Sequence, residues 1–263
     1  MKAKTKTFKG FLKKALMEGE QQIVECILSF NSEGLKINAN DPIKQARSMS
    51  WLMKDGFKEY EKIGNVGMND LPNVIKVLDR FGEFVVLKKE GNLLTVSGES
   101  DGRKKSVDIE LIAETFLTTE TGAPDLEFEE TFQVSATHLK DILKDVSMNK
   151  DATLTFTTKD KLVEVSNTGK YKFLNTINAP TCKGGVTVTF GQPFMNAVAN
   201  LDGMLELSVK NDYPVKIMEK LETSVITLIV APRIDGEVQR PVKKEEPKVE
   251  PEEESKGDDV ETN

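Results

Sequence analysis

The sequence predicts an α+β fold in which one unit occurs twice, with antiparallel sheets and two helices in each copy. Three observations lead to this prediction: an internal repeat, runs of alternating apolar and polar residues, and turn-forming clusters between those runs. The turns are of hairpin length, which is too short for the crossovers that parallel strands need. The 263 residues are enough for one large domain or two modest ones.

Four segments with helical apolar spacing carry the repeat. The stretch 11–16, FLKKAL, resembles 138–143, HLKDIL, at an offset of 127 residues. The stretch 73–83, NVIKVLDRFGE, resembles 196–206, NAVANLDGMLE, at an offset of 123 residues. Apolar residues recur every three or four positions in each segment, so they share one helix face. We therefore predict two helices in each half of the chain.

The apolar period changes to two between and after these helices, which predicts strands. Each half then reads as a helix, several strands, a second helix and three more strands. The predicted strands are 23–30, 35–40, 46–53, 84–90, 93–98 and 106–112 in the first half, and 152–158, 162–167, 171–179, 186–190, 204–210, 213–219 and 225–231 in the second.

These patterns divide the chain into four parts. Residues 1–112 and 131–236 are the two repeated units, and 113–130 is a polar, acidic connector that crosses the surface. Residues 237–263 hold ten acidic and five basic residues with little to bury, so we expect an acidic, disordered tail. The tail carries −5 of the net charge of −7, which leaves only −2 on the body. A polyanionic partner is therefore compatible with the body.

Signatures of catalysis, metal binding and cofactor binding are absent from the sequence. The one histidine, His138, lies on the polar side of a predicted helix, away from any candidate nucleophile. Cys26 and Cys182 are in no metal-like spacing and read as buried, reduced thiols. We therefore expect no enzyme activity, no cofactor and no metal. No apolar run is long enough for a membrane span, and the N-terminus lacks the apolar region of a secretory signal.

Basic residues lie on the helix faces opposite the apolar ones. On any single helix this pattern indicates an ordinary solvated face, but the repeat places all of these faces on one side of the sheet. Such a surface suits contact with phosphate oxygens without regard to base sequence. The predicted DNA-binding residues are Lys9, Lys13, Lys14, Lys76, Arg80, Lys140 and Lys144.

Five strings, in order, resemble the sliding clamps of the proliferating cell nuclear antigen type. They are LKKAL in the first helix, DGFKEYE (55–61), GAPDLEF (122–128) in the connector, DYPVKIME (212–219) and LIVAPRID (228–235). The resemblance covers about residues 8–235. It implies a duplicated clamp fold with sheets outside and helices lining the channel of a ring. Six such domains make the ring, so a chain of two domains would close it as a head-to-tail trimer.

The resemblance also implies two protein contacts. The trimer would pair Lys104–Leu111 with Lys170–Ile177 of the next chain, which covers two sheet edges. Partner peptides would dock beside the connector, in a pocket that departs from the family where Asn40 and Arg47 replace apolar residues and Ile229 replaces a common aromatic. Either the register slips by one, to Ala39 and Ala46, or the pocket takes a different peptide. The implied pocket residues are Asn40, Arg47, Ala123, Pro214, Ile229, Ala231 and Pro232.

The main hypothesis is a DNA polymerase processivity factor, a homotrimeric clamp that encircles duplex DNA and tethers replication and repair proteins. Its partners would be double-stranded DNA of any sequence, a DNA polymerase, a clamp loader and its own copies. One alternative is a subunit of a heterotrimeric or checkpoint-type clamp, and another is an enzyme on an unrelated duplicated fold. The divergence from the family leans toward an archaeal or viral source. The expected location is the cytoplasm, at the nucleoid or in an infected host, with the nucleus left open.

Overall fold

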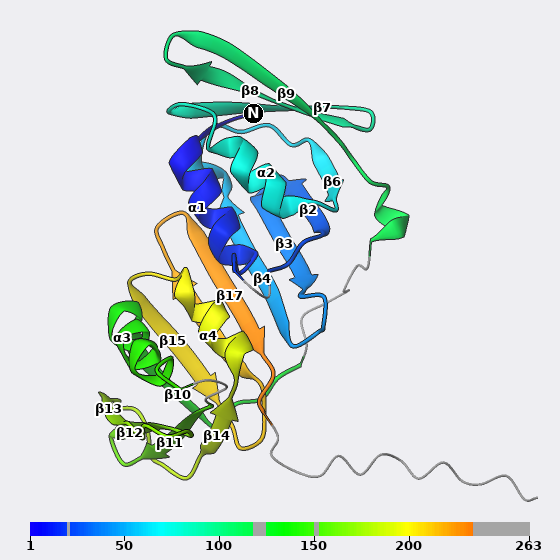
Figure 1. The fold of residues 1–263 in the computed structure, drawn as a ribbon. Helices are drawn as coiled ribbons and strands as arrows, with labels where there is room; N and C mark the ends of the chain where they lie inside the picture. Colours follow the sequence, from blue (N-terminus) through cyan, green and yellow to red (C-terminus); the bar gives the residue numbers. More distant parts are fainter. Residues whose placement is uncertain (20–21, 118–124, 150–152, 234–263) are drawn as a thin grey trace, which may run out of the picture.

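The computed structural model describes residues 1–19, 22–117, 125–149 and 153–233 (Figure 1). The predicted tail, and Ala123 of the predicted pocket, lie outside the described residues. No helix of the described part is long and apolar enough to cross a membrane.

The four predicted helices are present, two in each half. They are α1 (Thr5–Ala15), α2 (Leu71–Leu78), α3 (Ala136–Val146) and α4 (Gln192–Ala199). Two of the predicted helical segments, 73–83 and 196–206, were too long, because α2 ends at Leu78 and α4 at Ala199. Phe81 and Leu201 lie beyond these ends yet remain buried, which explains why the apolar spacing looked helical past the last turn. Pro72 and Pro193 occupy the first turn of α2 and α4, where a proline costs no hydrogen bond.

The strands form three sheets in which every strand pair is antiparallel, which confirms the predicted fold class. The five-stranded sheet runs in the order β5 (Phe57–Glu59), β1 (Lys2–Lys4), β7 (Phe84–Glu90), β8 (Leu93–Ser100) and β9 (Arg103–Glu110). The eight-stranded central sheet runs β10 (Glu130–Ser135), β15 (Met204–Val209), β16 (Val215–Lys220), β17 (Ser224–Val230), β4 (Ala46–Met53), β3 (Gly34–Asn40), β2 (Cys26–Asn31) and β6 (Gly64–Met68). The four-stranded sheet runs β13 (Leu174–Asn178), β12 (Leu162–Asn167), β11 (Leu154–Lys159) and β14 (Thr187–Phe190).

Four of these strands were not predicted from the sequence: β1, β5, β6 and β10. Two of them, β1 and β5, are only three residues long, and the sequence of β6, GNVGM, contains two glycines. Strand β10 begins at Glu130, the last residue assigned to the connector. Two short 3-10 helices complete the fold, η1 (Lys54–Gly56) and η2 (Glu114–Phe116).

The two halves share the central sheet. Its middle is the pair β17 and β4, so the last strand of the chain hydrogen-bonds to a strand of the first half. All four helices lie on one side of this sheet (Figure 1). Buried side chains of both halves form one hydrophobic core cluster, in which Phe156, Phe190 and Phe194 contact one another.

The central sheet therefore has two distinct faces. Along β4, Ala46, Ser48, Ser50 and Leu52 are buried, and the residues between them are only half-buried. Strands β16 and β17 alternate in the same way. We call the side that carries the helices the helix face, and the opposite side the outer face.

Candidate functional site

A groove between α1 and the end of α2 gathers cations of the first half. It encloses about 460 Å³ and is lined by Lys6, Lys9 and Lys13 of α1 and by Asp79. Lys9 forms an ion pair with Asp79, and Lys13 Nζ lies 2.6 Å from a carboxylate oxygen of Glu18. The groove thus has a lining rich in lysine, and it lies on the helix face.

Lys6 is a groove residue that the sequence reasoning missed. It is exposed, and it precedes Lys9 and Lys13 by three and seven residues. That spacing places all three lysines on one helix face, so the signal was present in the sequence.

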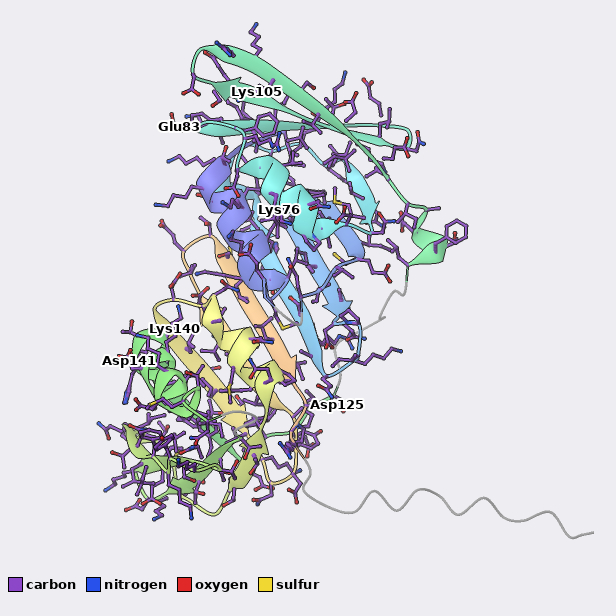
Figure 2. All side chains as sticks on the ribbon, in the orientation of Figure 1. Lys76, Glu83, Lys105, Asp125, Lys140 and Asp141 are labelled. Atoms are coloured by element: carbon purple, nitrogen blue, oxygen red, sulfur yellow. The ribbon has the colours of Figure 1, made fainter. Side chains whose placement is uncertain are left out.

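Lys76 and Arg80 extend the cationic side beyond the groove. Both side chains are exposed, Lys76 on α2 (Figure 2) and Arg80 in the turn that follows the helix. Lys76 Nζ donates a hydrogen bond to Asn73 Oδ1 at 3.4 Å, a neutral partner that leaves the ammonium charge unmatched by that contact.

Lys14 is placed differently from the other predicted phosphate ligands. Its Nζ lies 2.9 Å from both carboxylate oxygens of Glu219 and 3.2 Å from Asp202. The Lys14 side chain is 13% exposed and that of Glu219 only 1%. Since Glu219 belongs to β16, this buried ion pair joins the first helix to the second half of the chain. Lys14 therefore holds the two halves together and has little charge left for a phosphate.

The second half contributes a weaker cationic surface. Lys140 Nζ lies 3.5 Å from Asp202, and Lys144 Nζ lies 2.8 Å from Asp141 on the same helix. The hydrogen bond and charge of Lys144 lower the pKa of Asp141, and the carboxylate raises the pKa of Lys144 in return. Partial burial acts to raise the pKa of Asp202, but Lys14 and Lys140 outweigh it, so that pKa lies below its ordinary value. Both aspartates remain ionised at neutral pH and dilute the positive charge of α3.

The predicted pocket residues of the central sheet lie in one row on its outer face. Asn40 of β3 is paired with Arg47 of β4, and Arg47 with Ile229 of β17. Ala39 and Ala46, the residues offered by a slipped register, are buried on the other side. The outer face at this row is therefore polar and cationic, and which of these residues contact a peptide stays a prediction.

A small hollow adjoins this row at the connector. It encloses about 120 Å³ and is lined by Asn40, Pro42 and Leu117, among others. Ala231 and Pro232 continue from the end of β17, and the N–H of Ala231 donates to Gln45 O at 2.8 Å. Pro214, which precedes β16, is half-buried, as are Ala231 and Pro232.

The two strands predicted to join neighbouring chains are both sheet edges. Strand β9 ends the five-stranded sheet and β13 ends the four-stranded sheet. They lie at opposite ends of the molecule (Figure 1). A hollow of about 800 Å³ beside β9 is lined by Phe84, Val86 and Lys104, among others. Leu174 of β13 is 67% exposed. An exposed leucine on an unpaired sheet edge favours pairing with another chain.

Other reactive side chains show no sign of a catalytic arrangement. His138 is exposed on α3, where its backbone N–H donates to the capping hydroxyl of Ser135 at 3.1 Å. Both thiols are free and buried, and burial is the main cause that raises the pKa of Cys26 to about 12 and that of Cys182 to about 11. Within the described ranges, no three His, Cys, Asp or Glu residues gather to hold a metal ion.

Comparison with known sequences finds relatives of a single kind. No family model matches the chain. A DNA polymerase sliding clamp of Methanococcus maripaludis strain C7 is 26% identical over 244 residues, which cover 85% of this chain and 96% of the relative. The sliding clamp of strain C5 is 25% identical over the same share of both chains.

Solved structures show the same fold at low sequence identity. The PCNA of A. fulgidus, bound to the C-terminal region of FEN-1, has a TM-score of 0.79 and 18% identity, and covers 90% of this chain and 98% of its own. The PCNA of Entamoeba histolytica has a TM-score of 0.75 and 18% identity, with 89% and 98% covered. A PCNA2–PCNA3 complex from Sulfolobus tokodaii has a TM-score of 0.73 and 18% identity, with 88% and 98% covered. Along most of its length, then, the chain has the fold of a PCNA-type sliding clamp and is similar in sequence to DNA polymerase sliding clamps.

Proposed function

We propose that this protein is a DNA polymerase processivity factor, a non-enzymatic ring that encircles duplex DNA and tethers replication and repair proteins. The observation that carries the proposal is that one molecule has both a cationic groove beside its helices and an unpaired edge strand at each end. The cationic groove lies on the helix face, and the edge strands β9 and β13 lie at opposite ends of the molecule. Head-to-tail pairing of β9 with β13 would close a ring with the helices turned toward its hole. Such a ring would act where the cell or virus keeps its DNA.

The proposed division of labour follows from the site geometry. Lys6, Lys9, Lys13, Lys76 and Arg80 would contact phosphates, and Lys140 and Lys144 would add weaker contacts because aspartates neighbour them. Lysine and arginine contacts to phosphate oxygens position a protein on DNA without reading its sequence. Loose contacts of this kind suit a ring that slides.

Removal of the helix-face cations is expected to weaken DNA binding and reduce its salt dependence. Each lost phosphate contact lowers the slope of log affinity against log salt by about 0.9, so the combined change Lys6→Ala, Lys13→Ala, Lys76→Ala and Arg80→Ala should lower it by about 3 to 4. The measurement is fluorescence anisotropy of a linear duplex over a sodium chloride series. The matched control removes four exposed lysines outside the four α-helices, Lys54, Lys58, Lys62 and Lys88. Equal slopes for the two variants would show that the helix-face cations do not contact the DNA.

The outer row at Ile229 is proposed to bind partner peptides. Ile229→Asp is expected to weaken binding of a peptide with the sequence of the A. fulgidus FEN-1 C-terminal region by at least about thirtyfold, the effect of losing a contact worth about 2 kcal/mol. Isothermal titration calorimetry measures it. Thr227→Asp, two residues earlier on the same face of β17, is the matched control and should change affinity much less. Equal losses in both variants would indicate a general charge effect rather than a pocket at this row.

A ring assembled with sister chains is the second candidate. The observation in its favour is that one solved structure of the same fold is a complex of two different clamp chains, PCNA2 and PCNA3. The purified chain alone would then stay below the trimer mass of about 88 kDa, three times 29.3 kDa, and reach it only when a sister chain is added.

A further inference from the structure

The outer face of the central sheet carries a panel of cations around an apolar centre. Three cross-strand rows build it, and each row runs through β3, β4, β17 and β16. We call these twelve residues the outer panel: Lys36, Trp51, Val225 and Lys220 in the first row, Asn38, Met49, Thr227 and Met218 in the second, and Asn40, Arg47, Ile229 and Lys216 in the third.

The twelve residues of the outer panel carry charge of one sign, and Glu206 of β15 lies next to the panel, opposite Met218. The panel itself includes four cations and no Asp or Glu. Lys36 Nζ lies 5.1 Å from the centroid of the Trp51 ring and also contacts Glu33 of the preceding turn. Lys216 Nζ lies 5.3 Å from the centroid of the Phe128 ring, in the connector. Two of the four cations therefore rest on aromatic rings, and Lys36 is also paired with Glu33.

The described part of the chain ends beside this panel, and the acidic segment follows it in the sequence. Strand β17 contributes one residue to each row, and the chain leaves the sheet at Ala231. The N–H of Arg233 donates to Thr189 O at 2.7 Å, so the last described residue is held against β14. From Glu245 to Glu261 the sequence has nine acidic residues against two basic ones, a net charge of −7.

Chain length permits this acidic segment to reach every row. Glu245 follows Arg233 by twelve positions, and twelve extended residues span up to about 40 Å. Neighbouring rows are two residues apart along a strand, which is about 7 Å, so the far row lies only about 14 Å from the row of Ile229.

We propose that the acidic segment Glu245–Glu261 docks on the outer panel of its own chain. Its carboxylates would lie near Lys36, Arg47, Lys216 and Lys220, and its scattered valines and prolines near Met49 and Met218. Complementary charge selects this occupant over a basic or neutral segment. Because the third row is also the predicted peptide site, and in so far as the proposed function holds, the docked segment competes with partner peptides. Tethering gives the segment an effective concentration in the millimolar range, so it excludes weak ligands and yields to strong ones.

Trp51 reports on the panel directly, since it is the one tryptophan in the sequence. The test compares the tryptophan emission of the full chain with that of a chain truncated after Gly236, from low to high sodium chloride. We expect the two spectra to differ at low salt and to converge at high salt, because screening weakens the contact. A synthetic peptide of residues 245–261, added to the truncated chain, should restore the full-chain spectrum. Identical spectra at every salt concentration, with no response to the peptide, would overturn the proposal.

Two further sets of variants test whether the acidic side chains and the panel lysines themselves make the contact. Changing Glu250, Glu252, Glu253 and Glu254 to Gln in the full chain should reproduce the truncated spectrum without altering chain length. Lys216→Ala with Lys220→Ala should do the same, whereas the control pair Lys58→Ala and Lys88→Ala, on β5 and β7, should not. A spectral difference that grows with protein concentration would assign the docking to a second copy and overturn the intrachain form. None of these readouts involves DNA or a partner, so their failure leaves the proposed function untouched.

Discussion

Lys14→Ala is expected to lower the free energy of unfolding by about 3 to 5 kcal/mol. The change leaves the Glu219 carboxylate, 1% exposed, as a buried charge without its main partner. For a chain of this size the loss corresponds to a fall in melting temperature of roughly 6–20 °C. Differential scanning calorimetry measures it, in a Leu174→Lys background so that assembly does not contribute.

Lys13→Ala provides the matched control for this change. Lys13 is the neighbouring residue of the same helix, and its ion pair with Glu18 is about one-third exposed on both sides. Exposed pairs contribute less than about 1 kcal/mol, so the melting temperature should move little. The double change Lys14→Met and Glu219→Leu removes both charges and should recover most of the lost stability. Equal melting temperatures for Lys14→Ala and Lys13→Ala would contradict the assigned role.

Leu174→Lys is expected to dissociate the ring into folded single chains. A charge at the middle of a strand-to-strand joint should weaken self-association by at least about thirtyfold, since a buried anchor residue contributes about 2 kcal/mol or more. Leu174 is 67% exposed in the single chain, so the substitution should leave the fold intact. Sedimentation velocity measures the mass, and circular dichroism checks the secondary structure.

Met204→Lys is the control for surface hydrophobicity in general. Met204 is 56% exposed on β15, away from both edge strands. Its substitution should leave the mass of the assembly unchanged. Loss of assembly in both variants, or in neither, would argue against β13 as the joining strand.

Local patterns explain most of what the sequence could predict. Apolar spacing located all four helices, and alternation located most of the strands, because the period of the apolar residues depends on the type of element and on which of its faces is buried. The residues of the peptide pocket, which come from the family resemblance, stay predictions, although Asn40, Arg47 and Ile229 lie in one row. The domain limits and the exact residues of the DNA contact stay predictions.

The position of Lys14 shows what local patterns cannot supply. Its spacing from Lys13 and Lys9 made it look like one more cation of a solvated helix face. Its partner Glu219 is 205 residues away. Alternation along β16 places Glu219 on the buried face with Val215 and Ile217, but nothing in the sequence links it to Lys14. Only the packing of α1 against β17 and β4 turns this lysine inward, and that packing depends on the whole sheet.

The pairing of β17 with β4 also determines when the central sheet can close during translation. Ser224 lies opposite Leu52, 172 residues earlier in the chain, so the middle of the central sheet stays open until the ribosome has released almost the entire body. Until then β4 and β16 each present a bare backbone edge, and contacts so distant in sequence form slowly. The protein is thus at its most vulnerable to misassembly in the last moments of translation, when both half-sheets are built and the strand that joins them has yet to arrive.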